Sequence, residues 1–347
     1  MVKVAVLMSG GVDSTMAALL LKEQGYDISG LTMNNWDAAA VESAAQAARY
    51  LGISHEIIDL RRLFYDRVVE YFYRSYEKGF TPNPCVECNR HIKFGALLDF
   101  ALTQGFDQVA TGHYSRIEPD ESGKRFRLKK GIDPLKDQSY FLYGLNQYQL
   151  GRTLFPLGDL EKNRVLEMAR EAGLKAADNL ESQEICFIKN DYRDFIRDKV
   201  QYRPGEVVDR QGEILGSHLG LPFYTIGQRR GLGISAGQPI YVLELDMEGN
   251  RLVVGSEAEL YHHSLLLGEN NWIYQEEIDA PVKVEAKIRY ARRAAPARLA
   301  KDDGADTDRM RLTFDSPQRA ITCGQSAVCY YGEYVLGGGI ILAVESH

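Results

Sequence analysis

Residues 4–14 read Val-Ala-Val-Leu-Met-Ser-Gly-Gly-Val-Asp-Ser, and this stretch decides how the N-terminal half folds. An apolar run of strand character ends in a glycine turn, and residues 15–21 continue as an apolar helix. The two glycines let the backbone approach an anion, while the hydroxyls of Ser9 and Ser14 and the free N–H groups of the helix can bind phosphate oxygens. Two glycines alone would equally fit a tight strand-to-helix turn. Two serines and Asp13 in register at the helix start favour a phosphate cradle.

The composition is that of a soluble globular protein with more than one domain. At 347 residues, of which 45% are hydrophobic, the chain exceeds one compact domain and can form two or three cores. It has no N-terminal signal pattern, and no apolar run approaches the roughly 18 residues that cross a bilayer. We therefore predict a cytoplasmic protein that does not contact a membrane.

Two basic clusters stand out against a net charge of −7. One covers residues 124–136 and the other residues 283–301. The net charge argues against indiscriminate binding of nucleic acid, although a local cluster can still contact a polyanion. Charge runs are more often solvated faces, so the clusters by themselves are only weak evidence for a polyanionic partner.

The cysteines form a sparse, odd-numbered set. Five of them in a chain without a signal pattern argue against a secreted disulfide framework. Cys85 and Cys88 form a C-x-x-C motif among prolines, and the segment that follows has helical spacing. We therefore expect both thiols near a helix N-terminus, where the dipole lowers a thiol pKa and favours the thiolate. Cys186 is a third candidate, whereas Cys323 and Cys329 lie in a strand-like stretch and are expected to be packing residues.

A structural zinc site is the alternative for the C-x-x-C pair. Such a site needs four ligands, and the chain has no second C-x-x-C motif. Cys186 with a histidine such as His91 or His113 would have to complete it. A reactive or cluster-binding set of thiols is therefore preferred.

The turn at residues 9–14 lacks the lysine of a Walker sequence and resembles the PP-loop of ATP pyrophosphatases, which cleave ATP between the α and β phosphates and adenylate an acceptor. Together with further segments, from residue 4 to about residue 341, it closely resembles the family of tRNA-specific 2-thiouridylases. The segments are Ser9-Gly-Gly-Val-Asp-Ser14, Thr81-Pro-Asn-Pro84, Cys88-Asn89, Ile92-Lys-Phe94, Ala110-Thr-Gly-His-Tyr114, Lys136-Asp-Gln-Ser-Tyr-Phe-Leu142, Ile185-Cys-Phe-Ile188, Tyr224-Thr-Ile-Gly-Gln-Arg-Arg-Gly-Leu-Gly233 and Gly324-Gln-Ser-Ala327. The resemblance implies ATP-dependent transfer of sulfur, with Mg²⁺, to C2 of the wobble uridine in the anticodon stem-loop of glutamate, lysine and glutamine tRNAs.

The resemblance also implies roles for single residues. Cys88 matches the catalytic cysteine, and Cys186 matches the cysteine that carries the incoming persulfide sulfur and then forms a disulfide with Cys88. The matching ATP-site residues are Leu7, Met8, Ser9, Gly10, Gly11, Val12, Asp13, Ser14, Met33 and Gly112, and Asp13 is also a catalytic candidate. The matching tRNA or target-base contacts are Asn83, Pro84, Cys85, His113, Lys136, Asp137, Gln138, Arg289, Tyr290 and Gln325. Without the resemblance, Met33 would be interpreted as a core residue, His113 as a loop or core histidine and Gly112 as a turn residue.

Cys85 departs from the family pattern, in which many members have an aspartate that resembles a general acid or base. A thiol can still shuttle a proton. Cys85, Cys88 and Cys186 also resemble the cysteine trio that holds a 4Fe-4S cluster in other PP-loop tRNA thiolases, with one iron open to bind sulfide. Both the cluster route, which is slightly preferred, and the Cys186 persulfide route stay open. The sulfur donor is accordingly a cysteine desulfurase, a relay protein or free sulfide.

The order of elements predicts an α/β fold followed by β-rich domains. Residues 1–190 alternate strand-like runs with helix-period stretches, which is typical of a doubly wound parallel sheet, here the PP-loop (adenine nucleotide α-hydrolase-like) domain. Ligands in such sheets bind at the C-terminal ends of the strands. Residues 191–258 are predicted to form a small central β-rich domain. Residues 259–347 are predicted to form a C-terminal antiparallel β-barrel, which the resemblance supports and whose basic strand near Arg289 would bind the tRNA.

The alternative function is that of a PP-loop ATP pyrophosphatase that adenylates a small molecule. Such an enzyme would not need Cys88, Cys186 or the basic C-terminal strand. A protein that merely binds tRNA or a nucleotide is a further alternative. It predicts normal wobble thiolation in cells whose only copy of this protein carries Asp13→Ala.

Overall fold

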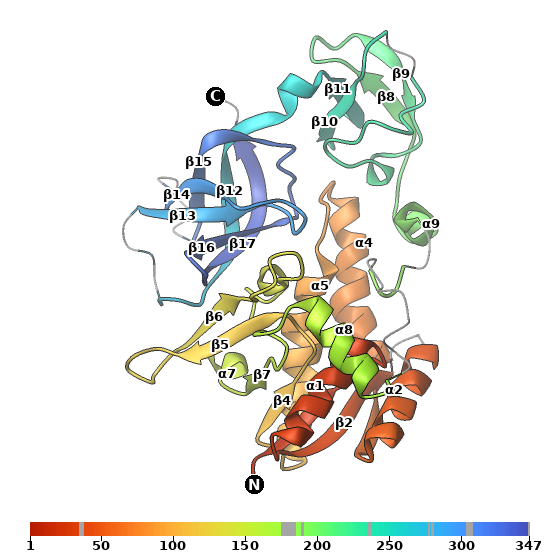
Figure 1. Ribbon diagram of the computed structural model, residues 1–347. Helices are drawn as coiled ribbons and strands as arrows, with labels where there is room; N and C mark the ends of the chain where they lie inside the picture. The colour runs from red at the N-terminus through yellow and green to blue at the C-terminus, as the bar shows by residue number, and fades with distance from the viewer. Residues whose placement is uncertain are drawn as a thin grey trace.

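The computed structural model describes residues 1–34, 38–174, 185–188, 191–234, 237–276, 278, 281–302 and 308–345. Figure 1 shows the N-terminal parallel sheet with its helices at the bottom, the barrel in blue at the upper left and the central part in green and cyan at the upper right. The predicted α/β class, followed by β-rich parts, is confirmed. None of the helices within the described residues is long and apolar enough to cross a membrane.

The N-terminal sheet is parallel throughout, as predicted. Its strands, in spatial order, are β3 (Ser54–Asp59), β2 (Asp27–Asn34), β1 (Lys3–Leu7), β4 (Gln108–Ala110) and β7 (Thr153–Leu154). Strand β1 is central and is buried on both faces, because Val4 and Val6 pack against two helices on one side while Ala5 and Leu7 pack toward a third helix on the other. This explains why the strand is apolar at successive positions rather than at alternate ones.

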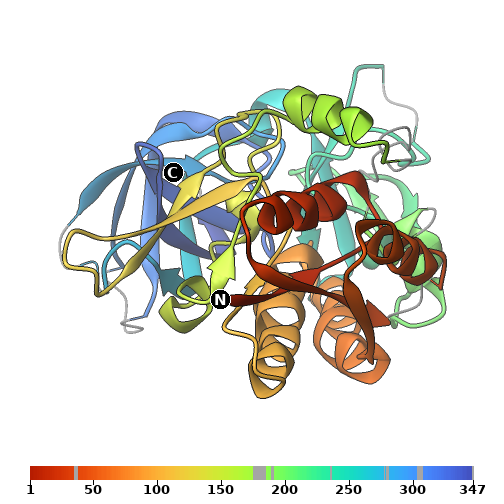
Figure 2. The same cartoon turned by 60° about the horizontal axis from the view of Figure 1, so that its bottom comes forward.

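Helices cover both faces of this sheet, as the doubly wound pattern predicts (Figure 2). The helices of this part are α1 (Val12–Glu23), α2 (Ala38–Leu51), α3 (Arg61–Phe64), π-helical η1 (Tyr65–Val69), α4 (Glu70–Glu77), α5 (Pro84–Glu87), π-helical η2 (Cys88–Ala96), α6 (Leu97–Thr103), 3₁₀-helical η3 (Ser139–Phe141), α7 (Gln147–Leu150) and α8 (Lys162–Glu171). Helices α1 and α2 pack on one face and α6 on the other. Helix α8 packs on α1 through a small apolar cluster.

The central part is a small mixed sheet with short helices. Its elements are α9 (Tyr192–Arg197), β8 (Gly205–Val208), β9 (Ile214–His218), η5 (Leu221–Phe223), β10 (Tyr241–Asp246), β11 (Arg251–Gly255) and η6 (Glu257–Leu260), and the strand order is β10-β11-β8-β9. Its apolar core also includes side chains from the N-terminal part. Phe72 and Tyr76 of α4 are buried in the same cluster as Val207 and Val242, so α4 anchors the central part to the N-terminal part.

The C-terminal part is a closed antiparallel barrel. Its strands are β12 (Tyr261–Trp272), β13 (Val282–Lys287), β14 (Ala295–Lys301), β15 (Met310–Arg319), β16 (Ser326–Tyr331) and β17 (Tyr334–Glu345). The ring closes because β12 pairs with both β15 and β17. Cys329 on β16 is fully buried in the barrel core, which confirms its packing role, whereas Cys323 precedes the strand and is only partly buried.

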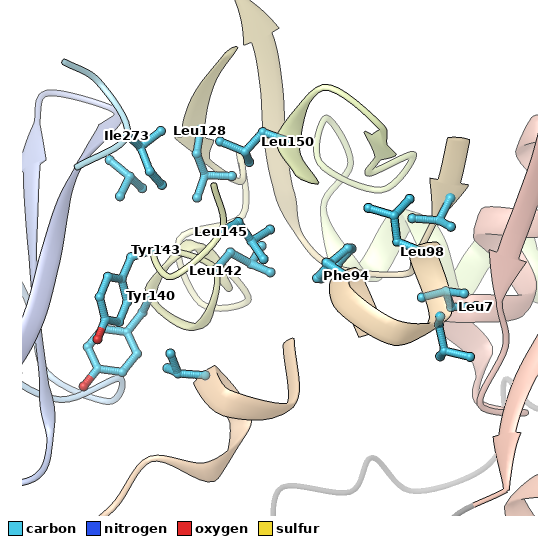
Figure 3. Packing of buried hydrophobic residues seen from close by; sticks show 14 of the residues in the cluster. Leu7, Phe94, Leu98, Leu128, Tyr140, Leu142, Tyr143, Leu145, Leu150 and Ile273 are labelled. Carbon is cyan, nitrogen blue, oxygen red and sulfur yellow. The ribbon is translucent and has the colours of Figure 1, made fainter. Parts of the chain in front are cut away.

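A hairpin from the N-terminal part extends the barrel sheet. Strands β5 (Ser115–Pro119) and β6 (Phe126–Lys130) pair with each other, and β6 also pairs with β17. Figure 3 shows the core at this junction, in which Leu128 and Tyr140 lie on the side of the barrel and Leu7 lies on the side of the parallel sheet, at the end of β1. One apolar cluster therefore runs from β1 to the barrel strands.

We expect Leu128→Ala to destabilise the protein strongly, because Leu128 is fully buried in the cluster that joins the hairpin to the barrel. Removing such a side chain costs about 2–5 kcal/mol. Ile132→Ala is a suitable control, since Ile132 is 45% exposed. Thermal unfolding followed by circular dichroism should show a clear loss for Leu128→Ala and little change for the control. Equal melting temperatures would contradict a shared core.

Candidate active site

A cavity of ≈ 230 Å³ lies at the C-terminal ends of β1, β2 and β4. The predicted site residues that line it are Leu7, Met8, Ser9, Asp13, Ser14, Met33, Gly112, His113 and Gln138. Lys93 and Thr111 also line it, although no role was assigned to either from the sequence. Strand ends far apart along the chain therefore meet at one place, where parallel sheets bind their ligands.

The turn between β1 and α1 is held by short-range hydrogen bonds. The Ser9 N–H donates to Ser14 Oγ at 3.1 Å, the two serine hydroxyls lie 3.2 Å apart, and the Ser14 hydroxyl donates to the Gly11 carbonyl at 3.1 Å. Gly10 has φ +77°, and a Cβ there would lie 2.5 Å from Ser43 Cβ on α2. The turn thus requires glycine at position 10 both for its backbone conformation and for the approach of α2.

Asp13 is held by two residues that are distant in sequence. Its carboxylate accepts hydrogen bonds from Lys162 Nζ at 2.7 and 2.9 Å and from the Tyr114 hydroxyl at 2.7 Å. The Lys162 side chain is buried at the start of α8. Lys162 was missed from the sequence, because it lies 149 residues from Asp13 and belongs to no motif that we singled out. It brings a positive charge beside the cradle, which a Walker sequence would provide locally.

The turn after β4 closes the cavity from the other side. A Cβ at Gly112 would lie 2.6 Å from the Asp13 carbonyl carbon and 2.7 Å from the Ser14 nitrogen, so the two turns touch backbone to backbone. His113 Nδ1 lies 2.6 Å from Thr111 Oγ1. Burial lowers the pKa of His113 well below its usual value, and Lys93 adds to this effect. His113 is therefore neutral near pH 7.

Cys85 and Cys88 lie where the sequence places them, but their electrostatics differ from the expectation. Helix α5 begins at Pro84, and Cys88 starts the π-helix η2. Burial raises the pKa of Cys85 to about 11 and that of Cys88 to about 12, and Lys93 opposes the shift only in part. The predicted lowering of both pKa values is wrong, because desolvation of the thiolates outweighs the helix dipole and the lysine.

Cys186 is exposed and lies on the short described segment 185–188. The neighbouring Phe187 packs edge-on against Phe64 and Phe72, with ring centroids 5.7 and 5.6 Å away. Cys186 also acts electrostatically on the pKa values of Cys85 and Cys88, so the three cysteines lie near one another. Residues 181–184, which precede this segment, lie outside the described residues.

The described residues do not form a ready metal site. They contain no group of three His, Cys, Asp or Glu side chains that could hold a metal ion. His91 instead faces Glu87 at 3.3 Å, and His113 faces Thr111. The three cysteines lie near one another, but as placed they fit neither the zinc alternative nor a three-thiolate cluster site.

The residues predicted to contact tRNA form two groups. Gln138 lines the cavity, and its Oε1 accepts the Tyr114 N–H at 3.1 Å. Asp137 is buried, accepts the N–H groups of Gly131 and Ser139, and lies 3.5 Å from Lys287 Nζ. Lys136 directly precedes Asp137 and is partly exposed.

The second group lies at the junction with the barrel. The Arg289 guanidinium donates to Thr322 Oγ1 and to the Ile226 and Ala320 carbonyls, and Tyr290 packs on Phe141 at 4.5 Å. Gln325 Nε2 donates to the carbonyls of Thr81 and Pro82, directly before Asn83 and Pro84. These polar groups have partners within the chain.

Three family models cover almost the whole chain. Residues 2–190 match the tRNA methyl transferase HUP domain, residues 193–256 the tRNA methyl transferase PRC-barrel domain, and residues 262–341 the aminomethyltransferase beta-barrel domain. The tRNA-specific 2-thiouridylase MnmA of Syntrophomonas wolfei is 54% identical over 98% of this chain and 99% of that protein. The MnmA of Heliobacterium modesticaldum is 47% identical over 98% of this chain and 92% of its own.

The chain belongs to the tRNA-specific 2-thiouridylase family. The resemblance stated from the motifs is thereby confirmed, and members of this family are sulfurtransferases. Among solved structures, a 4-thiouridine synthetase in complex with RNA and ATP is similar at a TM-score of 0.39 and 18% identity, over 53% of this chain and 44% of that one. A likeness that low adds nothing to the family assignment.

We expect Gly112→Ala to weaken ATP binding by about tenfold or more, which corresponds to about 1.4 kcal/mol. The new methyl group would meet the backbone of Asp13 and Ser14, and backbone cannot swing aside as a flexible side chain can. Gly237→Ala is the control, because a Cβ at Gly237 meets nothing within 4 Å. Isothermal titration with a non-hydrolysable ATP analogue measures both. Unchanged affinity in Gly112→Ala would contradict the assignment of this cavity to ATP.

In the free protein, we expect alkylation of Cys88 by iodoacetamide to rise about tenfold per pH unit between pH 7 and 10. The pKa of Cys88 is raised to about 12, so throughout this range the thiol is mostly protonated and the reactive thiolate grows in proportion to hydroxide. Peptide mass spectrometry should also find Cys88 slower than the exposed Cys186. A plateau in the Cys88 rate near pH 7 would show that the pKa is low instead.

Proposed function

We propose that this protein is a tRNA 2-thiouridylase that adenylates the wobble uridine with ATP and then transfers sulfur to its C2 atom. The observation that carries the proposal is the convergence of the phosphate cradle and the cysteine segment. Lys93 lies on the same helix as Cys88, acts on the pKa values of Cys85 and Cys88, and lines the cavity with Ser9 and Ser14. An ATP phosphate and a reacting thiol can therefore reach the oxygen and the carbon of one substrate carbonyl.

The cradle would bind the ATP phosphates through the hydroxyls of Ser9 and Ser14 and the N-terminal N–H groups of α1. The adenosine would lie toward Met33 and Gly112. Lys162, which pairs with Asp13, would also attract the phosphates through its positive charge. Mg²⁺ is usually held by one or two carboxylates and the substrate phosphates. Asp13 would fit this role, because its carboxylate accepts three hydrogen bonds and has about four lone-pair sites, so that one could bind the ion. The ion would neutralise charge on the phosphates.

Sulfur transfer follows from the chemistry of Cys88 and Cys186. The uridine O2 attacks the α phosphate, pyrophosphate leaves and the N3 proton passes to solvent, which converts a poor leaving group into AMP. The terminal sulfur of a Cys186 persulfide attacks C2, and the C2–O bond breaks. The Cys88 thiolate then attacks the Cys186 sulfur and displaces the 2-thiouridine sulfur with its electron pair. The resulting disulfide needs an external thiol reductant before the next turnover.

We derive no step through an iron–sulfur cluster, because the described residues offer no three-ligand group. In the persulfide route Cys85 supports the reaction beside Cys88. Its thiol stays protonated near neutral pH and can donate a proton where an aspartate of other family members would act. The Asn83 and Pro84 backbone would face the target base at the start of α5.

The partners follow from this reaction. The polyanionic substrate would be the anticodon stem-loop of glutamate, lysine and glutamine tRNAs, and exposed basic residues near the barrel give it a surface. A cysteine desulfurase or a relay protein would load the exposed Cys186, while free sulfide would suit a cluster instead. We infer a cytoplasmic location, in which these partners occur together.

The decisive test is thiolation of an unmodified glutamate tRNA transcript with ATP and a persulfide donor, followed by nucleoside mass spectrometry. We expect 2-thiouridine with stoichiometric AMP, and a loss of about 100-fold or more in both Cys88→Ser and Cys186→Ser. Cys323→Ser is the control, because Cys323 lies outside the cavity lining. Full activity of both variants would contradict the proposed function.

Iron analysis of anaerobically purified protein separates the two sulfur routes. The persulfide route predicts full activity without iron and only partial loss in Cys85→Ala. About four irons per chain, lost together with activity in Cys85→Ala, would instead establish the cluster and overturn the persulfide step.

A further inference from the structure

The segment that leads into β16, residues 320–325, is fixed in the barrel and projects toward the N-terminal part. The Gly324 N–H donates to the Ile341 carbonyl at 2.9 Å, and the Ile341 N–H donates back to the Gln325 carbonyl at 2.8 Å. These bonds tie the segment to β17. Its position is therefore set by the barrel rather than by the active-site residues it touches.

This segment grips residues 81–82 at three points. The Thr81 N–H donates to the Cys323 carbonyl at 2.9 Å, and Gln325 Nε2 donates to the Thr81 carbonyl at 3.1 Å and the Pro82 carbonyl at 3.3 Å. Gly324 has φ +87°, and a Cβ there would lie 2.7 Å from Phe80 Cβ and 2.9 Å from the Thr81 nitrogen. The two backbones thus touch, and the glutamine amide places both of its protons on adjacent carbonyls.

The next residues of the gripped loop are held from the same side. The Tyr140 hydroxyl is hydrogen-bonded to the Asn83 side chain and donates to the Ser326 carbonyl at 2.9 Å. Pro82 and Pro84 have fixed φ angles and no N–H groups, so the loop is stiff and depends on outside donors for its carbonyls. A shift of Thr81 would consequently also move Pro84, where α5 begins. Cys85 and Cys88 would move with it.

The segment also reaches the central part. The buried Arg289 guanidinium joins Thr322 and Ala320 to the Ile226 carbonyl, and the Ala320 N–H donates to the Leu260 carbonyl at 2.8 Å. Residues 320–325 therefore lie where all three parts of the molecule meet.

We propose that Gln325 is a positioning residue, which clamps residues 81–82 to the barrel and thereby sets the place and the burial of Cys85 and Cys88. The clamp acts in the free protein, through contacts within the chain. A role of Gln325 as a mere tRNA contact predicts instead that its loss leaves the cysteines of the free protein unchanged.

The test compares Gln325→Met with Gln318→Ala in the full chain, without ATP or tRNA. Methionine keeps the volume of the side chain and removes both donors. Gln318 is partly exposed, and its Nε2 donates within its own strand, to Ser316. We expect native-state alkylation of Cys88, normalised to Cys186, to rise about tenfold in Gln325→Met, since two hydrogen bonds no longer hold the loop closed. A ratio equal to that of Gln318→Ala overturns the proposal. Melting temperatures and a second variant, Gln325→Ala, separate loop release from general unfolding.

A kinetic readout tests the link to catalysis and rests on the proposed function. With tRNA at saturation, Gln325→Met should lower the single-turnover rate of thiolation while the tRNA KM and the ATP affinity stay near those of wild type. A raised tRNA KM with unchanged alkylation would assign Gln325 to tRNA binding alone. If wild type does not thiolate tRNA at all, the proposed function fails, whereas the alkylation ratio still tests the clamp.

Discussion

The close contact between the turn after β1 and the turn after β4 is the constraint on which the site depends. There is no room for a Cβ at Gly112, which touches the Asp13 and Ser14 backbone, nor at Gly10, which touches α2. Because both turns are backbone against backbone, the N-terminal N–H groups of α1 and the Ser9 and Ser14 hydroxyls converge on a small volume. Lys162 of α8 then pairs with Asp13, which lines this volume. Anion binding here is a property of packing, not only of a motif.

The cysteines show a conflict between burial and reactivity. A buried thiol is protected from solvent and from adventitious oxidation, but its thiolate is costly to form, and Cys88 has a pKa raised to about 12. The positive charge of Lys93 acts in the opposite direction without cancelling the cost. Any event that exposes residues 81–84 to water, or brings positive charge nearer to Cys88, would lower the pKa of this thiol and raise its reactivity. In the proposed reaction, the position of this loop would therefore set the reactivity of Cys88.

The sequence alone predicts the elements that are determined by interactions between neighbouring residues. The strand, turn and helix at residues 4–21 were predicted because apolar period and turn chemistry act over a few residues. Lys162 and the bonds from Gln325 to Thr81 could not be predicted, since their partners lie 149 and 244 residues away. The sign of the cysteine pKa shift was missed for the same reason. A helix dipole can be inferred from sequence, but burial is set by the whole fold.

The same reasoning changes the interpretation of the basic cluster at residues 283–301. Lys287 lies against the buried Asp137. Arg289 donates its hydrogen bonds to carbonyls and a hydroxyl at the junction of the three parts. Burial and the nearby Arg292 lower the pKa of Arg289, so this cation is held at an electrostatic cost that its hydrogen bonds offset. With β6 in the barrel sheet and one core from β1 to β17, the barrel cannot rotate freely on the N-terminal part without breaking apolar packing. A substrate that binds the barrel is thereby held in a defined position relative to the cysteines.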